Sequence, residues 1–195
     1  TDGTAALVRA MIPRWPQLQM LASAAPGKKA AITTGVHTAT GDLVVLTDAD
    51  VRFGAERVAS IAAHWQAERS EMIVLPVFTA GHGLLGRMQE EEQAALLGTT
   101  MGSAMQGRAV LAYGANLAFT RGAFLFVGGY HGDRFASGDD LFLLQRFQRA
   151  GKRITCLFNT DALVTAKAAP SFRSFVQQRL RWAGKMRGAG VTGSL

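Results

Sequence analysis

Residues 42–50 read Asp-Leu-Val-Val-Leu-Thr-Asp-Ala-Asp, a short apolar run that ends in two acidic residues. A nearly continuous apolar run of this length is typical of a central parallel β-strand that is buried on both faces. Both carboxylates, Asp48 and Asp50, are then predicted at the carboxyl end of that strand. Open α/β sheets bind ligands at this edge, because the loops that leave it surround a crevice. The stretch therefore predicts an α/β fold with an acidic ligand site.

The rest of the chain alternates helix-like and strand-like segments, which predicts a parallel sheet flanked by helices. The predicted helices cover residues 4–11, 27–40, 54–68, 83–105, 138–150 and 171 onward. Besides residues 42–47, the predicted strands cover residues 17–21, 72–78, 113–119, 153–158 and 162–165.

The composition indicates one compact globular domain over residues 1–195, with 48% hydrophobic and 18% charged residues. The single cysteine, Cys156, excludes an internal disulfide and lies in an apolar run, where a buried small side chain is expected. No uninterrupted apolar segment approaches the ~20 residues that a membrane-spanning helix needs. The chain as given is therefore expected to be soluble or peripheral.

A net charge of +7 suits an anionic partner, which could be nucleic acid, an acidic membrane surface or a phosphorylated small molecule. Five basic residues and no carboxylate occupy residues 173–187. Aromatic residues are not interleaved there in the manner of a base-stacking platform. The charge is thus interpreted as phosphate or membrane-surface chemistry, and no nucleic-acid partner is expected.

The pair Asp48 and Asp50 could face one hard cation if the turn between them bends inward. Mg²⁺ and Mn²⁺ take oxygen ligands and commonly share them with substrate phosphates. The alternative is a helix N-cap followed by an acid in the first turn, which aspartate also favours. The position at a strand end favours the metal site.

A second acidic pair, Asp139 and Asp140, precedes an apolar helical segment. Neighbouring carboxylates repel each other, which favours proton uptake by one of them and suits it to act as a general base. Helix capping by Ser137 or Asp139 explains the same residues equally well at this stage.

Two basic segments could contact phosphate. Arg181, in the stretch from Gln177 to Trp182, could pair with a phosphate in bidentate fashion, while Trp182 could cover a sugar ring. An amphipathic surface helix is the plain alternative there. Lys28 lies where a helix is predicted to start and could also approach a phosphate, although a simple loop fits the same residues.

The order of these motifs resembles the processive-type, inverting glycosyltransferases of family 2, which have the GT-A fold. The resemblance rests on Thr-Asp-Gly-Thr at residues 1–4, Gly-Lys-Lys-Ala-Ala at 27–31, Thr-Asp-Ala-Asp at 47–50, Ser-Gly-Asp-Asp at 137–140 and Gln-Arg-Leu-Arg-Trp at 178–182. It implies a Rossmann-like mixed sheet flanked by helices, a nucleotide-sugar donor with a UDP-sugar favoured, a glycan or lipid acceptor, and Mg²⁺ or Mn²⁺ as cofactor.

The resemblance also implies roles for individual residues. It implies that Asp48 and Asp50 hold the metal and that Asp140, beside Asp139, is the general base. The same resemblance places Asp2, Lys28, Asp48, Gln178, Arg181 and Trp182 at the donor. It also implies that the motif of Gln178, Arg181 and Trp182 contacts both the diphosphate and the acceptor end.

Members of this family begin with a strand before the Thr-Asp-Gly-Thr turn and commonly carry transmembrane helices. The chain is therefore expected to be a fragment that lacks its first strand and the flanking membrane segments, and to be inactive or nearly so by itself. The full protein is expected at the cytoplasmic face of the cell membrane.

Two other function classes fit part of the pattern. A metal-dependent nucleotidyltransferase also uses an α/β sheet and an aspartate pair, but it needs a Gly-rich basic loop after the first strand, which this chain lacks. A non-enzymatic basic module that binds anions or membranes explains the positive charge, but it does not explain the order of the motifs.

Overall fold

The computed structural model describes residues 3–132 and 139–188, and it divides into two compact units, residues 1–39 and residues 40–195. The first unit contains α1 (Thr4–Met11) and α2 (Lys28–Thr38), which agree with the predicted helices. The predicted strand at residues 17–21 is wrong, because these residues form no regular structure. A strand needs a hydrogen-bonding partner, and none of the described strand pairings involves this unit.

The main sheet of the second unit has four strands in the order β1-β5-β3-β6. These strands are β1 (Leu43–Thr47), β5 (Asn116–Thr120), β3 (Met72–Val74) and β6 (Ile154–Cys156). β5 is antiparallel to both β1 and β3, whereas β3 and β6 are parallel. The mixed sheet that the resemblance implies is confirmed, and the all-parallel sheet is wrong.

β1 is also an edge strand of this sheet, and its apolar residues are half-buried. The prediction of a central strand buried on both faces is therefore wrong. An apolar run indicates that side chains are buried, but it does not indicate whether the strand lies at the centre or at the edge of a sheet.

A second, smaller sheet has the order β2-β7-β4 and comprises β2 (Arg52–Phe53), β7 (Val164–Lys167) and β4 (Val77–Ala80). The single strand predicted at residues 72–78 is divided between the two sheets at Leu75-Pro76. Proline has no N–H group to donate to a ladder. The Pro76 carbonyl instead accepts hydrogen bonds from Asn116 Nδ2 and from the Val164 N–H.

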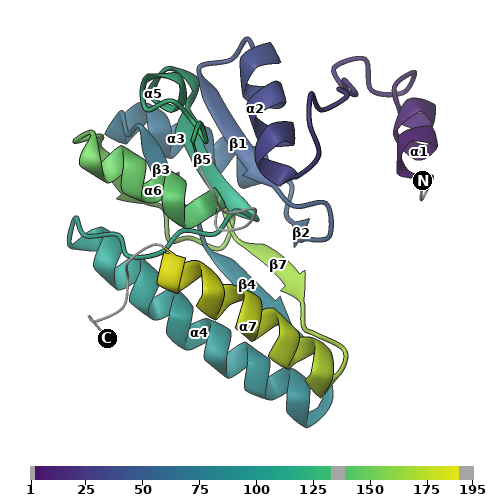
Figure 1. Cartoon of the computed structure of the whole chain (residues 1–195), viewed down its shortest axis with the longest axis vertical. Helices are drawn as coiled ribbons and strands as arrows, with labels where there is room; N and C mark the ends of the chain where they lie inside the picture. The colour runs from purple at the N-terminus through teal and green to yellow at the C-terminus, as the bar shows by residue number, and fades with distance from the viewer. Residues whose placement is uncertain (1–2, 133–138, 189–195) are drawn as a thin grey trace. The chain divides into compact units, whose positions relative to one another are not determined.

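Helices cover both faces of the main sheet (Figure 1). On one face, Ile61 of α3 (Arg57–Glu68) packs in a buried cluster with Ile73 and Ala118. On the other face, Phe119 contacts Phe124 of α5 (Arg121–Phe126) and Phe147 of α6 (Asp139–Arg149). Because successive residues of a strand point to opposite faces, Ala118 and Phe119 face different helix layers.

Two further helices lie beside the smaller sheet: α4 (Gly83–Met105) and α7 (Phe172–Gly188). Gln93 of α4 donates to the Val77 carbonyl of β4 at 3.1 Å, and Arg179 of α7 pairs with Glu92 of α4. α4 matches its predicted bounds, whereas α5 was not predicted. None of the helices in the described part of the chain is both long and apolar enough to cross a bilayer.

Candidate active site

Asp48 and Asp50 lie in the turn that follows β1, before β2 begins at Arg52. Asp48 is half-buried and Asp50 is exposed. No pair of this spacing can cap an α-helix here, because residues 52–53 form a strand and α3 begins only at Arg57. The structure therefore removes the helix-cap alternative for this pair.

Arg57 and Asn116 form a buried polar network next to this turn. The Arg57 guanidinium donates from Nη2 and Nε to Asn116 Oδ1, at 2.8 and 3.2 Å, and from Nη2 to the Leu46 carbonyl at 3.2 Å. Burial lowers the pKa of the Arg57 guanidinium. Asn116 stands opposite Thr47 in the β1–β5 ladder, so the network fixes the last residues of β1.

Asp140 in the first turn of α6 borders a small apolar cavity of about 130 Å³. Its Oδ2 accepts from the Gly114 N–H at 3.2 Å, and its Oδ1 accepts from the Leu141 N–H at 2.9 Å. The cavity is lined by Leu96, Leu111, Ala112, Tyr113, Asp140, Leu141 and Trp182. A carboxylate and an indole from separate helices, α6 and α7, therefore share one cavity.

Tyr113 lies on the wall of this cavity. Its hydroxyl is 3.0 Å from Thr100 Oγ1. Burial raises the pKa of Tyr113, and the neighbouring Asp140 charge adds to that rise, while the hydrogen bonds with Thr100 and Gln93 oppose it. The phenol is therefore neutral near pH 7 and can donate a hydrogen bond.

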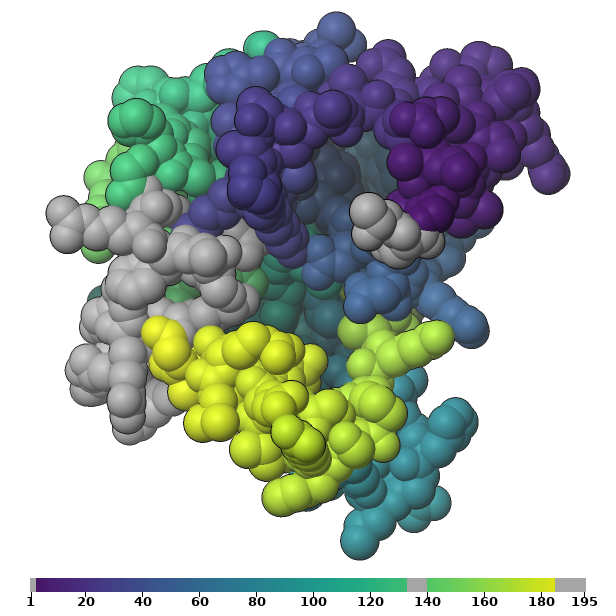
Figure 2. Space-filling view, turned by 45° about the vertical axis from the view of Figure 1, so that its right-hand side comes forward, coloured from purple at the N-terminus to yellow at the C-terminus, as the bar shows by residue number. Residues whose placement is uncertain are grey.

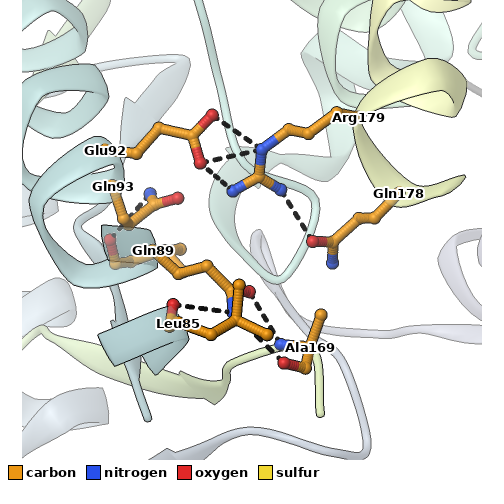
Figure 3. A network of polar contacts seen from close by, with 8 residues as sticks. Leu85, Gln89, Glu92, Gln93, Ala169, Gln178 and Arg179 are labelled. Atoms are coloured by element: carbon orange, nitrogen blue, oxygen red, sulfur yellow. Dashed lines mark hydrogen bonds and ion pairs between the residues drawn. The ribbon is translucent and has the colours of Figure 1, made fainter. Parts of the chain in front are cut away.

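Arg179 connects α7 with α4 (Figure 3). Its Nε donates to both Glu92 oxygens, at 2.7 and 2.8 Å, and its Nη1 donates to Gln178 Oε1 at 2.7 Å. The Arg179 guanidinium also lies 4.2 Å from the centre of the Trp182 ring. Arg179 thus holds both Gln178 and Trp182, the two motif residues on either side of it.

The remaining predicted donor residues are Arg181, Lys28 and Asp2. Arg181 is exposed, and Lys28 is exposed at the first position of α2 in the other unit. Asp2 lies outside the described residues, and the side chain of Asp139 is likewise not described. The roles of these four residues, like those of the other predicted site residues, remain predictions.

Sequence reasoning missed Arg57, Glu92, Tyr113 and Asn116. Tyr113 and Asn116 were assigned to a strand, and Glu92 to an acidic helix face. The spacing of single residues gives no sign of contacts between segments 59 or 87 positions apart. One signal in the sequence points to Asn116: it is a polar residue at the start of a largely apolar strand.

The turn at Asp48 and Asp50 fits a divalent cation that shares its coordination with a ligand. Among the described residues, no group of three or more His, Cys, Asp or Glu side chains is placed to hold a metal. Mg²⁺ and similar ions bind through one or two carboxylates plus substrate phosphates. A half-buried and an exposed carboxylate on one open turn match that donor set.

Known structures share this fold. The mannosyltransferase PcManGT from Pyrobaculum calidifontis, in complex with GDP-Man and Mn²⁺, matches with a TM-score of 0.65 and 22% identity over 100% of this chain and 53% of its own. Staphylococcus aureus TarS 1–349, in complex with UDP-GlcNAc, matches with a TM-score of 0.55 and 15% identity over 90% of this chain and 49% of its own.

Glucosyl-3-phosphoglycerate synthase from Mycobacterium tuberculosis, in complex with Mn²⁺, UDP and glucosyl-3-phosphoglycerate, matches with a TM-score of 0.51 and 19% identity. That match covers 100% of this chain and 67% of the synthase. The chain thus spans about half the length of the first two structures and about two thirds of the third.

No curated protein matches the sequence. The family model described as "Glycosyl transferase family group 2" matches residues 43–188, a range that runs from the start of β1 to the end of α7 and contains the Asp48–Asp50 turn, Asp140 and Trp182. The GT-A fold, implied by the sequence motifs, is confirmed by the solved structures that share it. The chain therefore belongs to the glycosyl transferase family group 2.

Proposed function

We propose that the protein transfers a sugar from a nucleotide-diphosphate-sugar donor, a UDP-sugar by preference, to an acceptor hydroxyl, with inversion at the anomeric carbon. The observation that carries this proposal is the cavity that Asp140 and Trp182 share in a chain of this family. Similar folds bound to GDP-Man, UDP-GlcNAc or UDP and Mn²⁺ support a nucleotide-sugar donor and a divalent metal, Mg²⁺ or Mn²⁺. Residues 1–195 are proposed to act as one catalytic domain.

The proposed chemistry divides between the two acidic sites. Asp48 and Asp50 would hold the metal, which would supply positive charge to the departing diphosphate. Asp140 accepts the proton of the acceptor hydroxyl as that oxygen attacks the anomeric carbon. Its hydrogen bonds from the Gly114 and Leu141 N–H groups fix the carboxylate in place before the acceptor arrives.

Trp182 supplies an apolar wall for the acceptor sugar. Indole rings present a flat apolar face that covers sugar rings well. The guanidinium of Arg179 stacks on the ring and is itself held by Glu92, so the indole is pre-organised. Gln178 and Arg181 are proposed to reach the donor diphosphate in the complex, because both belong to the same motif.

The acceptor is proposed to be a glycan or a lipid at the cytoplasmic face of the cell membrane, where nucleotide sugars are made. The exposed side of α7 supports this location (Figure 2). Phe172, Val176 and Leu180 are 65%, 37% and 67% exposed and lie at intervals of four residues, on one helix face. Arg173 and Arg181 flank this face, and such basic amphipathic helices lie on anionic lipid surfaces.

The test measures release of nucleoside diphosphate by the purified full-length protein from UDP-Glc, UDP-GlcNAc and GDP-Man, with Mn²⁺ and with EDTA. Asp50→Asn is expected to lower Mn²⁺-dependent donor binding by about tenfold or more, because it removes one charged ligand. Asp42→Asn, at the opposite end of β1, is the matched control and is expected to bind the donor normally. Pyrophosphate release from nucleoside triphosphates, without diphosphate release from nucleotide sugars, would contradict the proposal and favour a nucleotidyltransferase.

A further inference from the structure

The smaller sheet and the start of α4 border an open groove of about 590 Å³. This volume is in the range of small-molecule sites. The charged side chains on its walls, Arg52 and Lys167, are both basic. His82 and Thr165 are the other polar residues, and the remaining residues are small or apolar. The groove is lined by Arg52, Ala80, Gly81, His82, Leu85, Gly86 and residues 165–170.

Two permanent cations project from one face of the sheet into this groove. Arg52 stands opposite Thr165 in the β2–β7 pairing, and Lys167 follows Thr165 by two residues. Since residues two apart share a face of a strand, Arg52 and Lys167 lie on the same side. His82 immediately precedes α4, so the partial positive charge of a 23-residue helix adds to theirs.

No acidic residue lines the groove. Within the described parts of the chain, neither Arg52 nor Lys167 forms an ion pair. The groove is therefore positively charged and exposed, and its chemistry suits an anion. It contains no carboxylate for a divalent metal, so its anion differs from a metal-bound diphosphate.

The walls of the groove are held in place by buried polar contacts (Figure 3). Gln89 of α4, which is 1% exposed, accepts from the Ala169 N–H at 2.8 Å and donates to the Ala169 carbonyl at 3.1 Å. The Gly81 N–H, on the same groove, donates to Glu90 Oε1 at 2.9 Å. The shape of the groove therefore exists before a ligand binds, which reduces the ordering cost of binding.

Arg52 also brings the groove close to the turn that contains Asp48 and Asp50. It follows Asp50 by two residues, so their Cα atoms are at most about 7 Å apart. We propose that the groove of Arg52, His82 and Lys167 binds a phosphate group of the acceptor, and so orients the acceptor toward the donor at Asp48 and Asp50. This inference rests on the proposed sugar transfer.

The test measures binding of inorganic phosphate to the intact protein by calorimetry, with EDTA present so that no metal serves the donor site. The double variant Arg52→Gln/Lys167→Gln removes both cations of the groove. The double variant Arg69→Gln/Arg149→Gln removes two exposed cations elsewhere and is the matched control. The groove variant is expected to weaken phosphate binding about tenfold or more, and the control about twofold at most.

Two further measurements show whether phosphate binds outside the donor site and whether it comes from a lipid or from a soluble acceptor. Saturating UDP and Mn²⁺ should leave phosphate binding to the wild-type protein unchanged, because the donor occupies another site. Vesicles of phosphatidylglycerol in phosphatidylcholine are then sedimented with each variant. Loss of vesicle binding in the groove variant alone identifies a lipid phosphate, whereas equal vesicle binding by all variants identifies a soluble phosphorylated acceptor.

Three results would overturn the inference: undetectable phosphate and vesicle binding by the wild-type protein, equal loss in the groove and control variants, or displacement of phosphate by UDP and Mn²⁺. None of these readouts requires turnover. If phosphate binding fails these tests while the full-length protein still consumes nucleotide sugars, only this inference is removed. If the full-length protein binds phosphate at the groove but shows no turnover, the proposed function is removed.

Discussion

Arg57 donates two hydrogen bonds to the same atom, Asn116 Oδ1, from Nη2 and Nε. Both side chains are buried, with 2% and 0% exposure. Asn116 in turn donates to the carbonyls of Pro76 and Ala162, at 2.7 and 2.8 Å. One arginine at the start of α3 therefore connects the end of β1, the break between β3 and β4, and the segment that precedes β7.

Arg57→Met is expected to destabilise the fold, because it leaves Asn116 Oδ1 and the Leu46 carbonyl without these donors. An unsatisfied buried acceptor costs about 1–3 kcal/mol, so the free energy of unfolding in urea should fall by about 2 kcal/mol or more. Mn²⁺ affinity, measured by calorimetry, should fall about tenfold, as it does when residues that support metal ligands are lost. Wild-type stability together with wild-type Mn²⁺ affinity would show that the network does not support the turn.

Gly81→Ala is expected to be destabilising, because a Cβ at this position would lie 2.6 Å from Ala168 Cβ and 2.7 Å from Gly86 Cα. Overpacking of this kind costs about 1–3 kcal/mol. Gly98→Ala is the matched control, since Gly98 lies in the middle of α4 and a Cβ added there would meet open space. That control should gain up to about 1 kcal/mol from helix propensity. Equal thermal shifts for both variants would contradict the close approach of Gly81 and Gly86.

His64 should make stability depend on pH below neutrality. Its Nε2 lies 2.9 Å from Thr155 Oγ1, and burial lowers the pKa of the imidazole, although the Glu68 charge opposes this effect. In the unfolded state the His64 imidazole takes up a proton at about pH 6.5, whereas in the folded state it does so only at a lower pH. The contribution of His64 to stability is therefore complete above about pH 6.5 and is lost as the pH falls through the folded pKa.

The measurement is urea unfolding between pH 5 and pH 8. His64→Gln should flatten the pH dependence in the acidic half of this range, while His131→Gln, at an exposed position, should leave it unchanged. An unchanged slope in the His64 variant would assign the pH dependence to other groups.

The amphipathic and apolar segments of the fold could be predicted from the sequence, but their pairing could not. The bounds of α1 and α4 follow from local signals, namely Pro13 after one helix and Gly83 at the start of the other. The edge position of β1 and the antiparallel direction of β5 depend on contacts between distant segments. Local periodicity contains no information about them.

The candidate site, too, could be predicted from the sequence only in part. Asp48, Asp50, Asp140 and Trp182 could be named from short motifs, and the structure places the last two around one cavity. The motif did not indicate that Arg179, between Gln178 and Arg181, is the arginine that reaches α4. Which arginine faces inward depends on the packing angle of α7 against α4, and the motif spacing leaves that angle open.

Asp140 is proposed to act as the base in the sugar transfer, and the decisive variant is Asp140→Asn. The amide keeps an acceptor oxygen for the Gly114 or Leu141 N–H, so the fold should be preserved, but it cannot take up the proton. In the full-length protein, kcat is expected to fall about 10²–10⁴-fold, with donor affinity by calorimetry within about threefold of the wild type. Turnover of nucleotide sugar by this variant at the wild-type rate would show that Asp140 is not the base.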